Sequence, residues 1–213
     1  MTMAERSAAP AAVRPTYHSA ARDLLRQSIL DSVRDLLKER DWSKVSLSDV
    51  SKQAGVSRQT LYNEYGSRSG LAQAYAIRLA DRFVDQIDKA IWANIGDIRT
   101  ALSEAVSAFL QESAADPLVQ SLLTGEVKPD LLRLVTIDSA PIITHAVGRL
   151  VVVFQRSWVD ASDDDVRILA RSVVRLGLSY VSIPPESEYN VAADLAQLLG
   201  PFVESITTAD PSR

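Results

Sequence analysis

The sequence predicts an all-α protein in which a small N-terminal head of three helices is followed by a larger helical body. Apolar residues recur at intervals of three and four over most of the 213 residues, and the periodic segments end at Gly, Pro or short polar runs. No segment shows the alternation of a half-buried strand strongly enough to compete. We therefore divide the chain into an arm over residues 1–18, the head over residues 19–66 and the body over residues 67–213.

The composition excludes several kinds of chemistry. The chain has no cysteine, which excludes disulfides, thiolate metal sites, iron–sulfur clusters and cysteine nucleophiles. Its two histidines, His18 and His145, argue against a multi-histidine metal site. Asp163–Asp165 follow Ser162 at a predicted helix start, where the helix dipole favours carboxylates. We therefore expect neither a metal ion nor a cofactor.

Hydropathy and charge indicate where the protein is located and which partners it can bind. No run approaches the roughly 18 apolar residues of a membrane span, and the N-terminus lacks the apolar core of a signal peptide. We expect a cytoplasmic protein with no membrane partner. The net charge of −4 is uneven, because residues 1–66 carry 10 Lys and Arg against 8 Asp and Glu, whereas the remainder carries 13 against 19. A basic head on an acidic body keeps nucleic acid among the partners.

The head begins with a helix from Ser19 that ends in a short loop at Asp41–Trp42. A second helix follows Ser46, whose hydroxyl is expected to accept a hydrogen bond from the amide of Asp49. Gly55 ends this helix because glycine tolerates the left-handed backbone that follows a helix end. The arm before Ser19 is either a frayed terminus or a basic arm that reaches a DNA groove.

The third helix begins at Arg58, after Ser57 as its cap, and ends at Gly66. Leu61 and Tyr65 lie four positions apart and should face the core. Two short helices joined by a tight turn that contains glycine give the layout of a helix-turn-helix motif. The outward side chains, which can hydrogen-bond base edges or phosphates, are Arg58, Gln59, Thr60, Tyr62 and Asn63.

A long fourth helix is predicted after Ser67, through Ile95. About 25 residues at 1.5 Å each give almost 40 Å, which is long enough to link two domains. The pattern of the remaining body predicts six further helices, with breaks at Gly and Pro. Their predicted ranges are 98–114, 117–123, 129–136, 141–159, 163–183 and 191–206.

The segment from Val45 to Leu71 resembles the DNA-binding segment of the TetR family of bacterial transcriptional regulators. Its most specific part is Ala54–Ser57 followed by Thr60–Tyr62, and the resemblance covers about residues 19–70. It implies an all-α, one-component regulator, usually a repressor, that dimerises through its last two long helices. It also implies that a small effector binds the body and loosens the binding of double-stranded operator DNA.

A looser resemblance concerns the effector. The stretches Tyr62–Arg68, Leu122–Glu126 and Asp138–Ile142 are similar to those of actinobacterial members found beside alkane-hydroxylase genes. This similarity implies a long acyl or alkyl effector.

The resemblance assigns roles to residues of the head. Ser46 and Arg68 match positions near phosphates, and Arg68 stands where the family usually has Lys. Thr60 and Tyr62 match contacts to the DNA backbone and sometimes to bases. Sequence-reading positions of the family fall on Arg58, Gln59 and Asn63. The candidate DNA-binding residues are Ser46, Ser57, Arg58, Gln59, Thr60, Tyr62, Asn63 and Arg68.

Two residues depart from the family pattern. Glu64 stands where His or another neutral residue is common, and a carboxylate would repel a phosphate. We therefore expect Glu64 to point aside or to pair with a nearby basic residue. Gln59 stands where a small residue is frequent, so base contacts cannot be copied from relatives.

Apolar side chains of the body predict a ligand pocket, with a filled core as the alternative. The candidate pocket residues are Trp92, Phe109, Leu110, Leu122, Leu123, Phe154 and Trp158. The last two helices carry apolar faces that predict a homodimer, although they could instead complete a monomeric core. The candidate interface residues are Leu169, Val173, Leu176, Tyr180, Leu195, Leu198, Leu199 and Phe202.

These observations favour a homodimeric regulator, a repressor that a small hydrophobic effector releases from a palindromic operator. One alternative is a lipid-binding or interaction module without specific DNA binding. An all-α enzyme is a further alternative, but the sequence has no Gly-x-Ser-x-Gly elbow, phosphate loop or His-Glu-x-x-His motif. We therefore expect no enzymatic activity and no catalytic residues.

Overall fold

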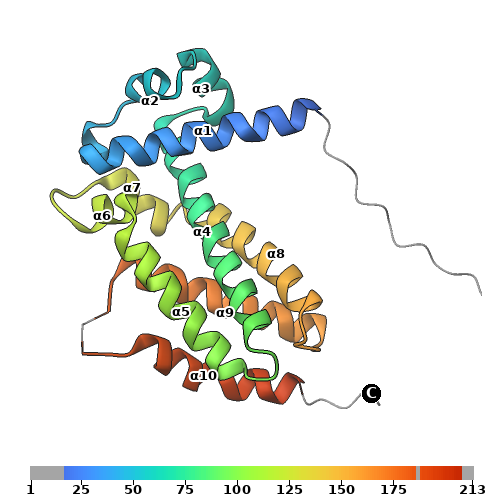
Figure 1. Ribbon diagram of the computed structural model, residues 1–213. Helices are drawn as coiled ribbons and strands as arrows, with labels where there is room; N and C mark the ends of the chain where they lie inside the picture. The colour runs from blue at the N-terminus through green and yellow to red at the C-terminus, as the bar shows by residue number, and fades with distance from the viewer. Residues whose placement is uncertain (1–16, 186–187, 208–213) are drawn as a thin grey trace, which may run out of the picture.

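The computed structural model describes residues 17–185 and 188–207, and this part of the chain is helical without a β-strand. Figure 1 shows a head of short helices crossed by one long helix, above a body of longer helices. The helices are α1 (Tyr17–Glu39), η1 (Trp42–Lys44), α2 (Leu47–Ala54), α3 (Arg58–Tyr65), α4 (Arg68–Ala93), α5 (Ile98–Ala115), α6 (Pro117–Leu123), α7 (Pro129–Val135), α8 (Ala140–Arg156), α9 (Asp163–Ser182) and α10 (Val191–Thr207). The all-α prediction is confirmed.

The helix bounds differ from the predicted ones by a few residues. Helix α1 begins at Tyr17, so the predicted arm loses its last two positions to the helix, and residues 1–16 lie outside the described residues. The predicted loop at Asp41–Trp42 is wrong in one respect, because a turn of 3-10 helix begins at Trp42. Asp41 caps this turn by accepting a hydrogen bond from the amide of Ser43 at 2.8 Å.

The predicted capping interactions of the head are confirmed. Ser46 and Asp49 form a reciprocal capping box at the start of α2. Gly55 ends α2 with a left-handed backbone, at φ 67°. Ser57 caps α3 and Ser67 caps α4, each by accepting a hydrogen bond from an amide three residues on. Local sequence therefore fixes the helix ends that set the geometry of the helix-turn-helix.

The left-handed backbone of Gly55 gives a stability prediction with an internal control. No neighbouring heavy atom would lie within 4 Å of a Cβ atom at Gly55 or at Gly148 in α8, so neither substitution is crowded. Gly55→Ala should lower the free energy of unfolding by about 1–2 kcal/mol, because alanine disfavours the left-handed conformation. Gly148→Ala should raise it by about 0.5–1 kcal/mol, because Gly148 is helical. Urea unfolding measures both, and shifts of the same sign would contradict the prediction.

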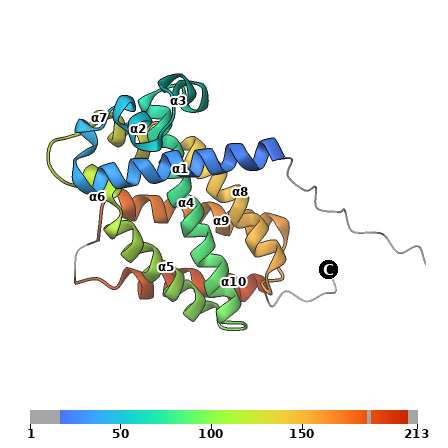
Figure 2. The ribbon, with the colours of Figure 1, turned by 45° about the horizontal axis from the view of Figure 1, so that its top comes forward.

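Helix α4 links the head to the body. It begins under α2 and α3 and runs down between α5 and α8, with which it packs extensively (Figures 1 and 2). Helix α10 packs along α5, and α9 packs against α8. One apolar core fills the space between α4, α5, α8, α9 and α10.

A second apolar core lies in the head but is not confined to it. Its buried residues include Val33 of α1, Val50 of α2 and Leu61 of α3. The same cluster contains Leu131 of α7 and, from the neighbouring helices α6 and α8, Leu118 and Ile142. The division of the chain after residue 66 stays a prediction, since the head shares its core with four helices of the body, namely α4, α6, α7 and α8.

Residues 129–156 form the one stretch of the described chain that is long and apolar enough for a membrane span by length and composition. In the structure this stretch is not one continuous helix, because residues 136–139 separate α7 from α8. Its apolar residues Leu131, Leu134 and Ile142 are buried in the shared core. Packing inside the protein therefore accounts for part of the apolar residues of this stretch.

A row of ion pairs joins α4 to α8. Arg149 donates to Asp81 at 2.7 Å and to Asp85 at 2.8 Å, and His145 lies 2.6 Å from the same oxygen of Asp81. Further along both helices, Arg156 of α8 pairs with Asp88 of α4. Because most of these side chains are partly exposed, each pair contributes little stability alone. Together they set the register between the two helices.

Candidate nucleic-acid interface and apolar cavity

Helix α3 presents a polar surface at the end of the molecule farthest from α10 (Figure 1). Leu61 is 1% exposed and fixes the inner face of this helix, as predicted. Arg58, Gln59 and Asn63 are exposed, and Tyr62 is 50% exposed. The outward residues predicted from sequence therefore lie on one accessible face, with Thr60 half-buried at its edge.

Hydrogen bonds hold the polar residues of α3 in place. The amide of Gln59 donates to Asn63 Oδ1 at 2.8 Å. This bond leaves Gln59 Oε1 as an acceptor and Asn63 Nδ2 as a donor, which is the pair of functions that reads an adenine edge. Arg58 donates to the hydroxyl of Ser48 in α2 and so ties the two helices of the motif together.

Two of the predicted contact residues, Ser46 and Ser57, have hydroxyls that already serve as helix caps. Ser46 Oγ lies 2.6 Å from Asp49 Oδ2, and Ser57 Oγ lies 2.9 Å from the hydroxyl of Thr60. Both serines remain exposed. Their contacts to DNA stay predictions.

The structure gives Arg68 partners inside the protein. Its Nε donates to the carbonyl of Val45 at 3.0 Å, its Nη1 donates to Asp130 at 2.8 Å, and its Nη2 donates to the carbonyl of Trp42. The guanidinium also lies over the Trp42 ring, 4.2 Å from its centroid. Arg68 is therefore directed into the junction between the head and the body, and its predicted contact with a phosphate stays a prediction.

The expectation for Glu64 is confirmed. Its carboxylate accepts hydrogen bonds from Arg22 and Arg26 of α1, each at 2.8 Å. Burial opposes ionisation of Glu64, but the hydrogen bonds from Arg26 and Arg22 outweigh burial and lower its pKa. Glu64 is turned toward α1 and holds two arginines beside the end of α3.

A polar junction joins the head to α6 and α7. Trp42 is 1% exposed, and its Nε1 donates to Asp130 Oδ2 at 2.7 Å. Its backbone amide donates to Ser121 Oγ at 3.1 Å. Arg68 donates to the same oxygen of Asp130. This carboxylate therefore binds both Trp42, which precedes α2, and Arg68, which follows α3.

A buried lysine forms the second half of this junction. The Lys128 side chain is 5% exposed, and its Nζ lies 2.8 Å from Asp41 Oδ2. It also donates to the carbonyl of Thr124 at 2.7 Å. Burial alone would raise the pKa of Asp41, but hydrogen bonds from Lys128 and Ser43 lower it to about 2.

The sequence analysis did not identify the junction. Trp42 stands in a polar segment that was interpreted as a loop, and Asp130 resembles an ordinary acidic residue in the first turn of a helix. One signal was available, because a buried tryptophan usually finds a partner for its N–H group.

An apolar cavity lies between six helices of the body. Its volume of about 80 Å³ is several times the roughly 10–15 Å³ that one water molecule needs. Ser113 is the one polar side chain among the described residues that line it. The lining residues are Ala76, Leu79, Ala80, Phe83, Phe109, Ser113, Leu118, Val119, Leu122, Leu131, Leu134, Val135, Ile142, Ile143, Ala146, Val174, Leu178 and Val181.

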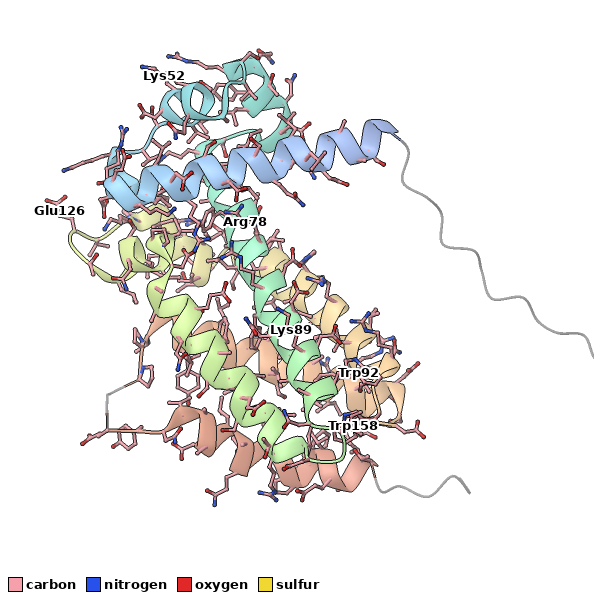
Figure 3. The ribbon with its side chains drawn as sticks, viewed as in Figure 1. Lys52, Arg78, Lys89, Trp92, Glu126 and Trp158 are labelled. Atoms are coloured by element: carbon pink, nitrogen blue, oxygen red, sulfur yellow. The ribbon has the colours of Figure 1, made fainter. Side chains whose placement is uncertain are left out.

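Two of the seven predicted pocket residues, Phe109 and Leu122, line this cavity. Leu110 lines a second, smaller cavity. The paired rings of Phe83 and Phe109 lie between the two cavities. The other four predicted residues do not line this cavity, because their side chains are directed elsewhere. Leu123 and Trp92 are partly exposed, Phe154 fills the body core, and Trp158 donates to the carbonyl of Ile91 at 2.8 Å. Figure 3 shows Trp92 and Trp158 at the end of α4 farthest from the head.

The structure also corrects the predicted dimer interface. Leu169, Val173 and Leu195 are buried within their own chain, so they are not available to a partner. Four further candidates are partly buried against the body, namely Leu176, Tyr180, Leu199 and Phe202. Only Leu198 of the predicted set is exposed, at 66%, and Ile168 on α9 adds a second exposed apolar side chain.

Two models of known protein families match this chain. The family model for bacterial regulatory proteins of the tetR family matches residues 29–75, and a model for the C-terminal domain of the bacterial tetracyclin repressor matches residues 97–201. The chain is 58% identical over 191 residues to the HTH-type transcriptional regulator AlkX of Mycobacterium tuberculosis, covering 90% of each protein.

Solved structures agree with the sequence comparison. The TetR family repressor AlkX from Dietzia sp. strain DQ12-45-1b, implicated in biodegradation of n-alkanes, is 39% identical with a TM-score of 0.80. The match covers 86% of this chain and 97% of that one. A TetR-family regulator from Streptomyces coelicolor, at 19% identity and a TM-score of 0.54 over 92% and 99% of the two chains, shares the fold.

Proposed function

The chain belongs to the TetR family of DNA-binding transcriptional regulators, and on this premise we propose that it is a repressor whose operator binding is relieved by an apolar effector. The observation that carries the proposal is the double role of α6 and α7. Leu122 of α6 and Leu134 of α7 line the apolar cavity, while Ser121 and Asp130 hold Trp42 in the head.

The DNA-binding part of the proposal assigns α3 to the major groove. Gln59 and Asn63 would contact base edges, and Arg58 and Tyr62 would contact bases or phosphates at the margin. The head has a modest positive charge, so affinity must depend on placed contacts and on two heads acting together. Ser46, Ser57 and Thr60 support the geometry of the motif through their caps.

We assign the dimer contact to the outward faces of α9 and α10. Ile168 and Leu198 are exposed apolar residues on these faces, where a partner would cover them. A two-fold dimer would place its recognition helices roughly 34 Å apart, one turn of a palindromic operator. Residues 67–213 would then serve as the ligand-binding and dimerisation domain, in the cytoplasm with the chromosome.

The effector is assigned from the chemistry of the cavity. A lining of aliphatic and aromatic side chains with one hydroxyl favours a hydrocarbon chain that carries at most one small polar group. The Dietzia relative is implicated in biodegradation of n-alkanes, which fits a long acyl or alkyl effector. Such a ligand weakens operator binding only through a difference in its affinity for the two arrangements of the head.

The cavity also favours a second candidate, a lipid-binding module without specific DNA binding. The relatives are transcriptional regulators, and we propose no enzymatic activity for this chain.

Selection of duplexes from a random pool by the purified protein separates these candidates. The repressor proposal predicts enrichment of one inverted repeat and, by native mass spectrometry, two protomers on each selected duplex. Recovery of unselected duplexes alone, with lipid retained on the protein, would instead support the lipid-binding module.

A further inference from the structure

We infer that Asp130 is a positioning residue that couples the apolar cavity to the helix-turn-helix through Trp42 and Arg68. This inference rests on the proposed function and adds the route by which the ligand acts. It follows from where α7 lies, because Figures 1 and 2 show this helix beside both the head and the upper part of α4.

Helix α7 contacts both the cavity and the head. Leu131 and Leu134 are buried and line the cavity. Asp130, in the first turn of the same helix and four positions before Leu134, bonds Trp42 and Arg68. In a helix of seven residues, a displacement of the leucines must also displace the carboxylate, since a helix this short moves as a rigid unit.

The two partners of Asp130 bracket the DNA-reading element. Trp42 begins η1, a few residues before α2, and Arg68 is the first residue of α4, directly after α3 and its caps. Arg68 also bonds the carbonyls of Trp42 and Val45, so it closes the chain around α2 and α3. A shift of Asp130 therefore acts on both ends of the helix-turn-helix together.

The Lys128–Asp41 pair strengthens this coupling. Lys128 precedes α7 by one residue, and its buried ammonium group bonds Asp41, the cap of η1. Separating a buried pair leaves an uncompensated charge, which is costly. The junction therefore favours one arrangement of α7 against the head and should change in a discrete step.

The geometry predicts the direction of the effect. An apolar chain that fills the cavity would push Leu131 and Leu134 outward and so displace Asp130 from the position in which it bonds Trp42 and Arg68. The head would then lose the contacts that fix its orientation, and the operator would bind less tightly. By linkage, bound operator should weaken ligand binding by the same factor.

The test compares Asp130→Ala with Asp138→Ala, with dodecanoic acid as the probe. Asp138 is a matched control, because its carboxylate pairs with Arg133 on the surface of the same segment and is not bonded to the head. In wild type the probe should weaken binding to the selected operator by a factor on the order of 5–150. Asp130→Ala should bind the operator less tightly without probe and retain only about a third or less of that factor. Asp138→Ala should retain it.

A single-tryptophan protein reports on the junction directly. Trp92→Phe with Trp158→Phe leaves Trp42 as the only tryptophan. With excitation selective for tryptophan, dodecanoic acid should shift its emission to the red as the Asp130 contact opens. Unchanged emission with the probe bound, seen by native mass spectrometry, would overturn the inference. An unchanged coupling factor in folded Asp130→Ala and Asp130→Asn would also overturn it. A wild type that binds no operator, or does not respond to the probe, would instead refute the proposed function.

Discussion

Replacing Trp42 by alanine is expected to lower the free energy of unfolding by about 3–5 kcal/mol, because it empties a fully buried site in the shared core. It also removes the hydrogen bond to Asp130 and the ring beneath Arg68. Since domains of this kind are stable by only about 5–15 kcal/mol, a substantial share of the total would be lost. Urea unfolding followed by circular dichroism measures the change.

The matched control is Trp92→Ala, which removes the same side chain from a position that is 47% exposed. Its cost should be about 1 kcal/mol or less, because little apolar surface is uncovered. Equal losses in the two variants would show that Trp42 has no special place in the junction. A loss below about 1 kcal/mol in Trp42→Ala would contradict the packing described for the head.

Replacing Gln59 and Asn63 together by alanine is expected to weaken binding to the selected operator by roughly 30-fold or more. Each base contact of this kind contributes about 1–3 kcal/mol, and the variant removes the amide pair from every head. Binding to unselected duplexes should change little, because phosphate contacts supply it. Fluorescence anisotropy with both duplexes measures the ratio.

Gln111→Ala is the control for the amide substitution, since Gln111 lies on α5 in the body, far along the chain from α3. It should leave both affinities unchanged. A parallel loss of specific and unselected binding in the α3 variant would indicate that the two amides contact the DNA backbone, and would contradict the assignment to base edges.

The sequence predicted the head well because its structure is encoded locally. Ser46 with Asp49 and Gly55 are patterns whose geometry depends on neighbours within a few residues. The predicted pairing of Glu64 required only that a charge near the DNA surface be neutralised, and Arg22 and Arg26 of α1 do so. The outward face of α3 followed from the position of Leu61.

The sequence predicted the body site poorly because the site depends on helix rotation and on contacts between distant segments. Phe154 and Trp158 share the helical spacing of true lining residues in the sequence. In the structure, however, Phe154 faces the core, and Trp158 lies beyond the end of α8, against α4. The buried positions of Leu169 and Leu195 likewise follow from packing against the body. The contacts of Arg68 inside the protein could not be predicted, because its partner Asp130 is 62 residues away.

The affinity of the protein for its selected operator, measured with and without dodecanoic acid, tests the central claim most directly. The claim that an apolar ligand in the body controls the head predicts a clear loss of affinity, by a factor on the order of 5–150, once the cavity is filled. Native mass spectrometry of the same sample confirms occupancy. An operator affinity that stays constant while each protomer holds a ligand would contradict the claim.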